Sequence, residues 1–195
     1  MECGNMNKDN EGKSNIYRYV LCGLMAAIIC LFAPISVPIG PIPVSLTNLV
    51  LYIAVYILSV GDAMLSLAVY MLIGIAGLPV FSGYSGGIAK LAGPTGGYLV
   101  GFFPMLLILG IVFLYVKKMK SPLIRTLIMI IAGVLATGVL YALGTVWFVY
   151  QMECTWEYAL SVCVIPFIPF DIGKIIIANI VGPMIRKPLS RLGLV

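Results

Sequence analysis

The sequence predicts an all-α membrane protein of six transmembrane helices with both termini in the cytoplasm. Of its 195 residues, 62% are hydrophobic and only 10% are charged, whereas soluble domains have about 25% charged and about 45–50% apolar residues. A spanning helix needs roughly 20 mostly apolar residues, so six fit this length. The composition therefore excludes a soluble enzyme, a disordered chain and a disulfide-rich secreted domain.

The chain divides into a polar start and an apolar remainder. Residues 1–15 lack an apolar run, so we expect a flexible cytoplasmic tail rather than a signal peptide. Residues 16–195 are expected to form one six-helix transmembrane domain that binds a substrate. The expected spans are 16–37, 44–60, 62–78, 94–116, 122–149 and 169–187. The short apolar stretch 156–165 is either an interfacial helix or an extension of the last span.

The distribution of Lys and Arg supports six spans and sets their orientation. Ten of the twelve basic residues fall before the first span, between the fourth and fifth, or at the end of the chain. These three places lie on one side of a six-span protein, and an excess of Lys and Arg marks the cytoplasmic side. We therefore interpret these clusters as topology signals rather than as ligand or nucleic-acid sites.

Two ionisable residues in the last span are not explained by topology. Asp171 and Lys174 are three residues apart and so share one face of a helix. Pro169 suits the first turn of that helix, where a carboxylate is stabilised by the helix dipole. A lysine one turn deeper needs a partner or a water-filled cavity. The pair is either a helix-capping ion pair or part of a pocket that opens outward.

The glycine-rich segment 80–98 contains Lys90, the only basic residue expected on the outer side. It lacks the phosphate-loop pattern, so it is either a flexible outer loop or a lid over a ligand. The proline-rich segment 36–48 is expected to be a rigid outer loop leading into the second span. Asn48 at the top of that span serves an interhelical hydrogen bond or a ligand.

Small residues in the first span are a further feature. Gly23 and Ala27 are four residues apart, a spacing that lets helices approach closely. They serve internal packing or docking of another membrane protein.

Catalytic and metal chemistry find little support in the sequence. The chain has no histidine, and none of its five cysteines forms a CxxC pair, so we expect no metal site and no cofactor. An intramembrane aspartyl protease using Asp62 and Asp171 is disfavoured, because these residues should lie at opposite membrane surfaces. A structural subunit without a ligand would leave Lys174 unexplained.

Three segments together resemble the BioY family, the biotin-specific substrate-binding (S) components of energy-coupling factor (ECF) transporters. The segments are PIPVSLTNL (41–49), GLPVFSGYSGGIAKLAGPTGGYLVGF (77–102) and PFIPFDIGK (166–174). The order and spacing match over nearly the whole chain after residue 15, and the second block is specific to the family.

The resemblance implies the S-component fold and high-affinity biotin uptake across the bacterial cytoplasmic membrane, with no ATPase activity in this chain. It implies a biotin pocket near the outer face with Asp171 and Lys174 as polar anchors, and Lys90 as the basic residue of the third-helix loop region. Asn48, Phe81, Tyr84 and Tyr98 are further candidates for the pocket. Gly23 and Ala27 align with the small-residue motif that docks S components onto a membrane coupling (T) subunit, which acts with two cytoplasmic ATPases. An S component for another small, vitamin-like solute is the alternative.

Overall fold

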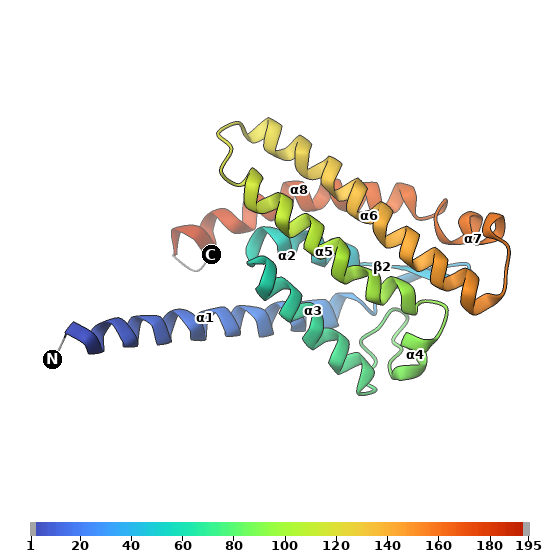
Figure 1. Cartoon of the computed structure of the whole chain (residues 1–195), viewed down its shortest axis with the longest axis horizontal. Helices are drawn as coiled ribbons and strands as arrows, with labels where there is room; N and C mark the ends of the chain where they lie inside the picture. Colours follow the sequence, from blue (N-terminus) through green and yellow to red (C-terminus); the bar gives the residue numbers. More distant parts are fainter. Residues whose placement is uncertain (1–2, 193–195) are drawn as a thin grey trace.

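The computed structural model describes residues 3–192, with side chains from residue 16 onward. Helices dominate it (Figure 1), as the sequence predicts. In chain order the elements are α1 (Cys3–Phe32), β1 (Ser36–Ile39), β2 (Ile42–Ser45), α2 (Thr47–Ile57), α3 (Val60–Ile75), α4 (Ile88–Ala92), α5 (Gly96–Val116), α6 (Pro122–Met152), α7 (Trp156–Cys163) and α8 (Ile168–Arg191).

Each of the six apolar segments predicted from the sequence contains a helix, but the lengths differ, and the predicted segments 16–37 and 44–60 also include part of β1 and β2. Within the described residues, α5, α6 and α8 are long and apolar enough to cross a membrane. The apolar part of α1, together with α2 and α3, is shorter. At 1.5 Å per residue, the 11 residues of α2 span about 16 Å, roughly half of a bilayer core. The structure thus shows three clear candidate spans and does not test the count of six.

The start of the chain is more regular than expected. The backbone of residues 3–15 continues α1, so this part of the predicted tail is helical. The side chains of residues 1–15 lie outside the described residues, and the division of the chain at residue 15 stays a prediction.

The expected rigid loop 36–48 is instead largely a β-hairpin, which is a correction to the sequence-based interpretation. Strands β1 and β2 pair antiparallel from Ser36–Ser45 to Ile39–Ile42. Gly40 lies between them at φ +79°, a conformation that glycine adopts without penalty. Ile42 and Val44 alternate with less buried neighbours and pack on Phe148 and Phe167. The hairpin forms because this alternation buries one face of β2.

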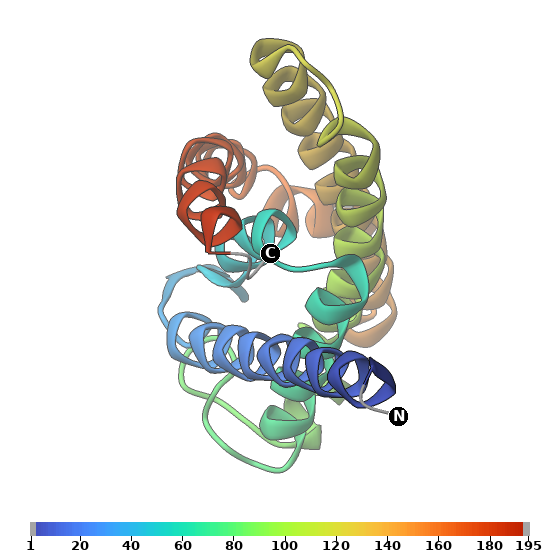
Figure 2. The ribbon, with the colours of Figure 1, turned by 90° about the vertical axis from the view of Figure 1, so that its left-hand side faces the viewer.

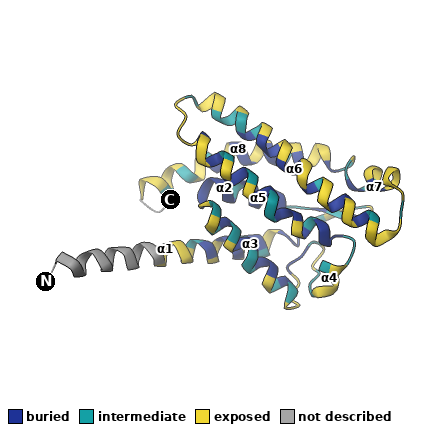
Figure 3. Cartoon of the chain, viewed as in Figure 1, coloured by how far each residue is buried: buried dark blue, intermediate teal, exposed yellow. Residues whose placement is uncertain are grey.

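The centre of the bundle is α2, which packs against α8 and α5, while α1 packs against α3 and α5 against α6. The largest fully buried core side chains come from α1, α2, α3, α5, α6 and the loop after α3; they include Ile29, Leu51, Tyr70, Phe81, Met105 and Leu140. Figure 3 shows that the helix faces pointing away from this core are largely exposed. Exposed apolar side chains such as Leu127, Leu135 and Ile180 are typical of helices that face lipid.

The two ends of the bundle differ in structure and in charge. The hairpin end carries β1–β2, α4 and α7, and the basic end carries the α5–α6 connection and the end of α8 (Figure 1). At the basic end, Arg18 of α1 forms a 3.0 Å salt bridge with Asp62, whose backbone N–H is capped by Ser59. These contacts fix the start of α3 against α1.

Candidate substrate site

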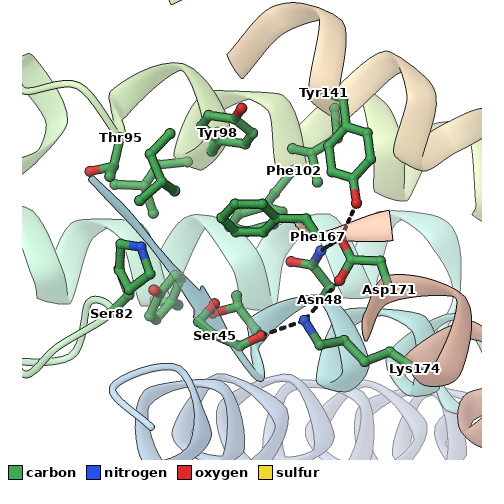
Figure 4. Close-up of a pocket in the computed structure, with 16 residues that line it drawn as sticks. Ser45, Asn48, Ser82, Thr95, Tyr98, Phe102, Tyr141, Phe167, Asp171 and Lys174 are labelled. Carbon is green, nitrogen blue, oxygen red and sulfur yellow. Dashed lines mark hydrogen bonds and ion pairs between the residues drawn. The ribbon is translucent and has the colours of Figure 1, made fainter. Parts of the chain in front are cut away.

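A cavity at the hairpin end brings together residues far apart in the sequence. Its walls come from β2, α2, α3, the 82–95 loop, α5, α6 and α8 (Figure 4). The space between these walls, together with its open mouth, is about 540 Å³. The lining residues are Ile42, Pro43, Ser45, Thr47, Asn48, Tyr70, Ser82, Thr95, Tyr98, Leu99, Phe102, Leu140, Tyr141, Phe167, Asp171 and Lys174.

Asp171 is the carboxylate of the cavity lining, and it accepts hydrogen bonds from three side chains. It lies in the first turn of α8 and is 2% exposed. Its Oδ1 accepts from Lys174 Nζ at 2.8 Å, and its Oδ2 accepts from the Tyr141 hydroxyl at 2.7 Å and from Asn48 Nδ2 at 3.3 Å. A buried carboxylate is tolerated when it is paired and hydrogen-bonded in this way.

Lys174 is the buried cation that balances this carboxylate. Its Nζ also donates to the backbone carbonyl of Ser45 at 2.8 Å, which ties α8 to the end of β2. An ammonium has three N–H donors, and these two contacts use two of them. Similarly, Asp171 Oδ1 accepts one hydrogen bond from the described residues and has a second lone-pair position. One donor and one acceptor thus remain side by side for a ligand.

Two hydrogen bonds hold the cavity wall and the loop next to it in place. The Tyr98 hydroxyl donates to the Cys163 carbonyl at 3.2 Å, which links α5 to the end of α7. Trp147 Nε1 donates to the Gly93 carbonyl at 2.9 Å and fixes the loop before α5 against α6. The wall thus combines aromatic and aliphatic side chains with several polar groups that can orient a ligand.

The structure brings some of the predicted site residues together and not others. Asp171, Lys174 and Asn48 line one cavity, and Tyr98 lines it as well. Phe81 is fully buried behind the wall, with its ring 5.5 Å from that of Tyr70 in an edge-to-face contact. It therefore supports a lining residue without lining the cavity itself.

Lys90 and Tyr84 lie outside the cavity lining. Lys90 is on α4, where burial lowers the pKa of its amine. Tyr84 is 71% exposed at the tip of the turn closed by Phe81 and Ser85, with φ +54°. Their assignment to the substrate stays a prediction.

Sequence reasoning missed several residues that complete the site. Tyr141, Ser45, Thr47, Phe102 and Phe167 line the cavity but were not singled out. A tyrosine in the middle of the apolar run 122–149 is a signal that could have pointed to Tyr141, because a buried hydroxyl needs a partner. The Ser45 contact uses a backbone carbonyl, for which the side chain gives no signal.

The proposed docking residues are well separated from this cavity. Gly23 and Ala27 are both exposed on α1, and a Cβ built on Gly23 would meet no atom within 4 Å. The structure therefore excludes tight internal packing at Gly23 and leaves this face of α1 open.

Tyr141→Phe should destabilise the protein measurably. The change removes a hydrogen bond to a buried carboxylate, which is worth about 1.5–3 kcal/mol. Thermal unfolding in detergent checks this loss. Tyr52→Phe is the matched control, because the Tyr52 hydroxyl is also buried but pairs with the neutral Thr137 hydroxyl at 2.6 Å. An equal loss in both variants would contradict a special role for the Tyr141–Asp171 contact.

The fold and the site together define a membrane-embedded protein with a buried, polar-anchored pocket for a small solute. The chain belongs to the BioY family, whose sequence profile matches residues 6–191. It is 33% identical over 178 residues to the biotin transporter BioY2 of Lactococcus lactis subsp. cremoris, covering 91% of this chain and 94% of that relative. It is also 33% identical over 171 residues to the biotin transporter BioY of Thermotoga maritima, covering 86% and 95%.

A solved structure shares the fold. The crystal structure of the S-component for biotin from an ECF-type ABC transporter superposes with a TM-score of 0.79, covering 90% of this chain and 93% of that one. The two sequences are 23% identical. The likeness confirms the S-component fold expected from the sequence.

Proposed function

We propose that this protein binds biotin with high affinity and mediates its uptake as the S component of an ECF transporter. Membership of the BioY family supports this, since the relatives described above are biotin transporters. The single observation that carries it is the buried cavity with Asp171 and Lys174 on one helix face. An S component for a different small vitamin is the alternative.

The unused hydrogen-bond donor of Lys174 and the unused acceptor position of Asp171 suit biotin. The ureido ring of biotin offers N–H donors beside a carbonyl acceptor, and the remainder is an apolar bicycle with a carboxylate tail. Asp171 accepts from a ureido N–H through its open lone pair, and Lys174 donates its third N–H to the ureido oxygen or to the carboxylate. Tyr98, Phe102 and Phe167 provide apolar contact for the ring system.

Competition binding tests this function. Purified protein in detergent should bind labelled biotin, and excess biotin but not thiamine should displace it. Biotin methyl ester decides what the lysine contacts: weak displacement assigns Lys174 to the carboxylate, and strong displacement assigns it to the ureido oxygen. Displacement of biotin by thiamine, or no biotin binding at all, would favour the alternative solute.

Topology and partners form the second part of the proposal. We infer six spans with both termini on the cytoplasmic side, in the bacterial cytoplasmic membrane. The basic end then faces the cytoplasm and the cavity lies near the outer face. Because the sequence has no nucleotide-binding motif, uptake is driven by a membrane coupling (T) subunit and two ATPase subunits, with no cofactor in this chain.

Lys90→Ala should weaken biotin binding less than Lys174→Ala does. Lys174 lines the cavity and donates to Asp171, whereas Lys90 lies on α4 outside the lining. Truncating Lys174 leaves the buried Asp171 without its cation, so we expect a loss of about tenfold or more. Titration calorimetry compares the two variants. Equal losses would show that α4 closes onto the ligand and would restore Lys90 to the site.

Gly23→Leu should preserve biotin binding and impair assembly with the T subunit. The leucine would project from the exposed face of α1 and would block the close helix approach that small residues permit. Gly138→Leu on α6 is the matched control, since Gly138 is also exposed with open space around it. Co-purification of the subunits measures assembly. Normal assembly of the Gly23 variant would remove this face from the docking surface.

A further inference from the structure

The short helix α2 leaves a hollow at the basic end of the bundle. Its 11 residues end at Ile57, while α5, α6 and α8 have 21, 31 and 24 residues and run past this point. Figure 2, seen from the basic end, shows α8 and the α5–α6 connection on different sides of α2. The space between them, its mouth included, is about 1130 Å³. We call it the basic hollow, and its lining is Tyr56, Phe113, Lys117, Lys118, Arg125, Pro183, Arg186, Lys187 and Ser190.

Five of the nine lining residues are cationic, and they come from three different segments. Two follow α5, one belongs to the start of α6 and two belong to the end of α8; they are Lys117, Lys118, Arg125, Arg186 and Lys187. Among the residues whose side chains the structure describes, none that lines the hollow carries a carboxylate. Among the described side chains, the salt bridges are Arg18–Asp62 and Asp171–Lys174. The positive charge of the hollow is therefore unbalanced by the described part of the chain.

Arg186 forms the fixed floor of this hollow. Its guanidinium donates to the Tyr56 carbonyl at the end of α2 and lies 5.1 Å from the centre of the Phe113 ring. These contacts hold the group against the end of α2 and leave other guanidinium N–H donors available. A preorganised arginine beside several lysines suits an anion with several oxygens, such as a phosphate group.

Membrane topology alone explains why basic residues lie at this end of the bundle. It does not explain why five of them line one hollow. Lys120 and Arg191 lie at the same end and have the same sign, yet neither lines the hollow. Beside the hollow, apolar side chains of α6 and α8 are exposed, with Leu127 56% and Met184 67% accessible. An anionic group held in the hollow therefore has apolar helix faces next to it, which suits the acyl chains of a lipid better than a free ion.

We propose that the basic hollow binds the phosphate headgroup of an anionic phospholipid, with its acyl chains along α6 and α8. Basic pockets between helices at one membrane surface are suited to such headgroups. The occupant fills the space that α2 leaves open and neutralises charges that otherwise repel one another. This inference depends on the basic end lying at a membrane surface and is independent of the solute bound at the hairpin end.

Native mass spectrometry tests the proposal. The protein in detergent is incubated with equal amounts of phosphatidylglycerol and phosphatidylcholine, and retained lipid is counted. We expect preferential retention of phosphatidylglycerol, and a decrease of about tenfold or more in Arg125→Gln/Lys187→Gln, because these two side chains line the hollow and would face the phosphate group. Lys120→Gln/Arg191→Gln is the matched control with the same change of net charge, and it should retain the lipid as wild type does. Biotin binding in all three proteins verifies the fold.

Three outcomes would overturn the proposal. Equal retention of both lipids would show that the headgroup charge is not recognised. An equal decrease in the control variant would assign binding to general surface charge. Displacement of phosphatidylglycerol by excess inorganic phosphate would make the hollow a site for a soluble anion rather than for a lipid.

Discussion

Asp171→Asn should lower the stability of the folded protein more than any other single substitution at the site. It should also abolish measurable biotin binding. The asparagine keeps the shape of the side chain but leaves Lys174, which is 7% exposed, as a buried cation without a counter-charge. Breaking a buried ion pair by removing one partner costs about 3–5 kcal/mol. Thermal unfolding in detergent and titration calorimetry measure the two effects.

A double variant separates the structural role of this pair from its role in binding. Asp171→Asn/Lys174→Met removes both charges, and replacing a whole buried pair is often nearly neutral for stability. We expect the double variant to recover most of the lost stability while it still fails to bind biotin. If binding returned together with stability, the pair would be a structural ion pair and the ligand would lie elsewhere.

Gly144→Ala should also reduce biotin binding strongly, through a residue that does not line the cavity. A Cβ at Gly144 would lie 2.4 Å from the Tyr98 ring, so the ring must move. Tyr98 lines the cavity, and its hydroxyl donates to the Cys163 carbonyl. The displaced ring would lose this bond and change the cavity wall, so we expect an affinity loss of about tenfold or more.

Gly138→Ala is the matched control for that substitution. Gly138 is six residues earlier in the same helix, and a Cβ there would meet no atom within 4 Å. Alanine favours a helix over glycine by up to about 1 kcal/mol, so this control should be as stable as wild type or more stable. Equal biotin affinity in both variants would show that the Tyr98 position does not shape the site.

The helical architecture followed from the sequence because lipid-facing helices have a strong compositional signal. Long apolar segments such as 94–116 and 122–149 correspond closely to α5 and α6. The hairpin at 36–45 was missed because its signal is an alternation over only four residues of β2, among prolines that usually disfavour strands.

Spacing in the chain predicted one contact of the site, and the family resemblance added Asn48 and Tyr98, which also line the cavity. Asp171 and Lys174 share a helix face, so their spacing was sufficient. Asn48 lies 123 residues from Asp171 and Tyr141 lies 30 residues away, and their hydrogen bonds depend on how α2, α6 and α8 pack. Lys90 was selected as the only outer basic residue, but α4 holds it outside the cavity lining.

Equilibrium dialysis of labelled biotin against the purified chain, without transport partners, tests the central claim most directly. The account predicts saturable binding of one biotin per chain that excess thiamine does not displace. It also predicts no binding by Asp171→Asn/Lys174→Met at a temperature where that variant is folded. Absence of binding by the wild type, or wild-type affinity in the folded double variant, would contradict a biotin site built on Asp171 and Lys174.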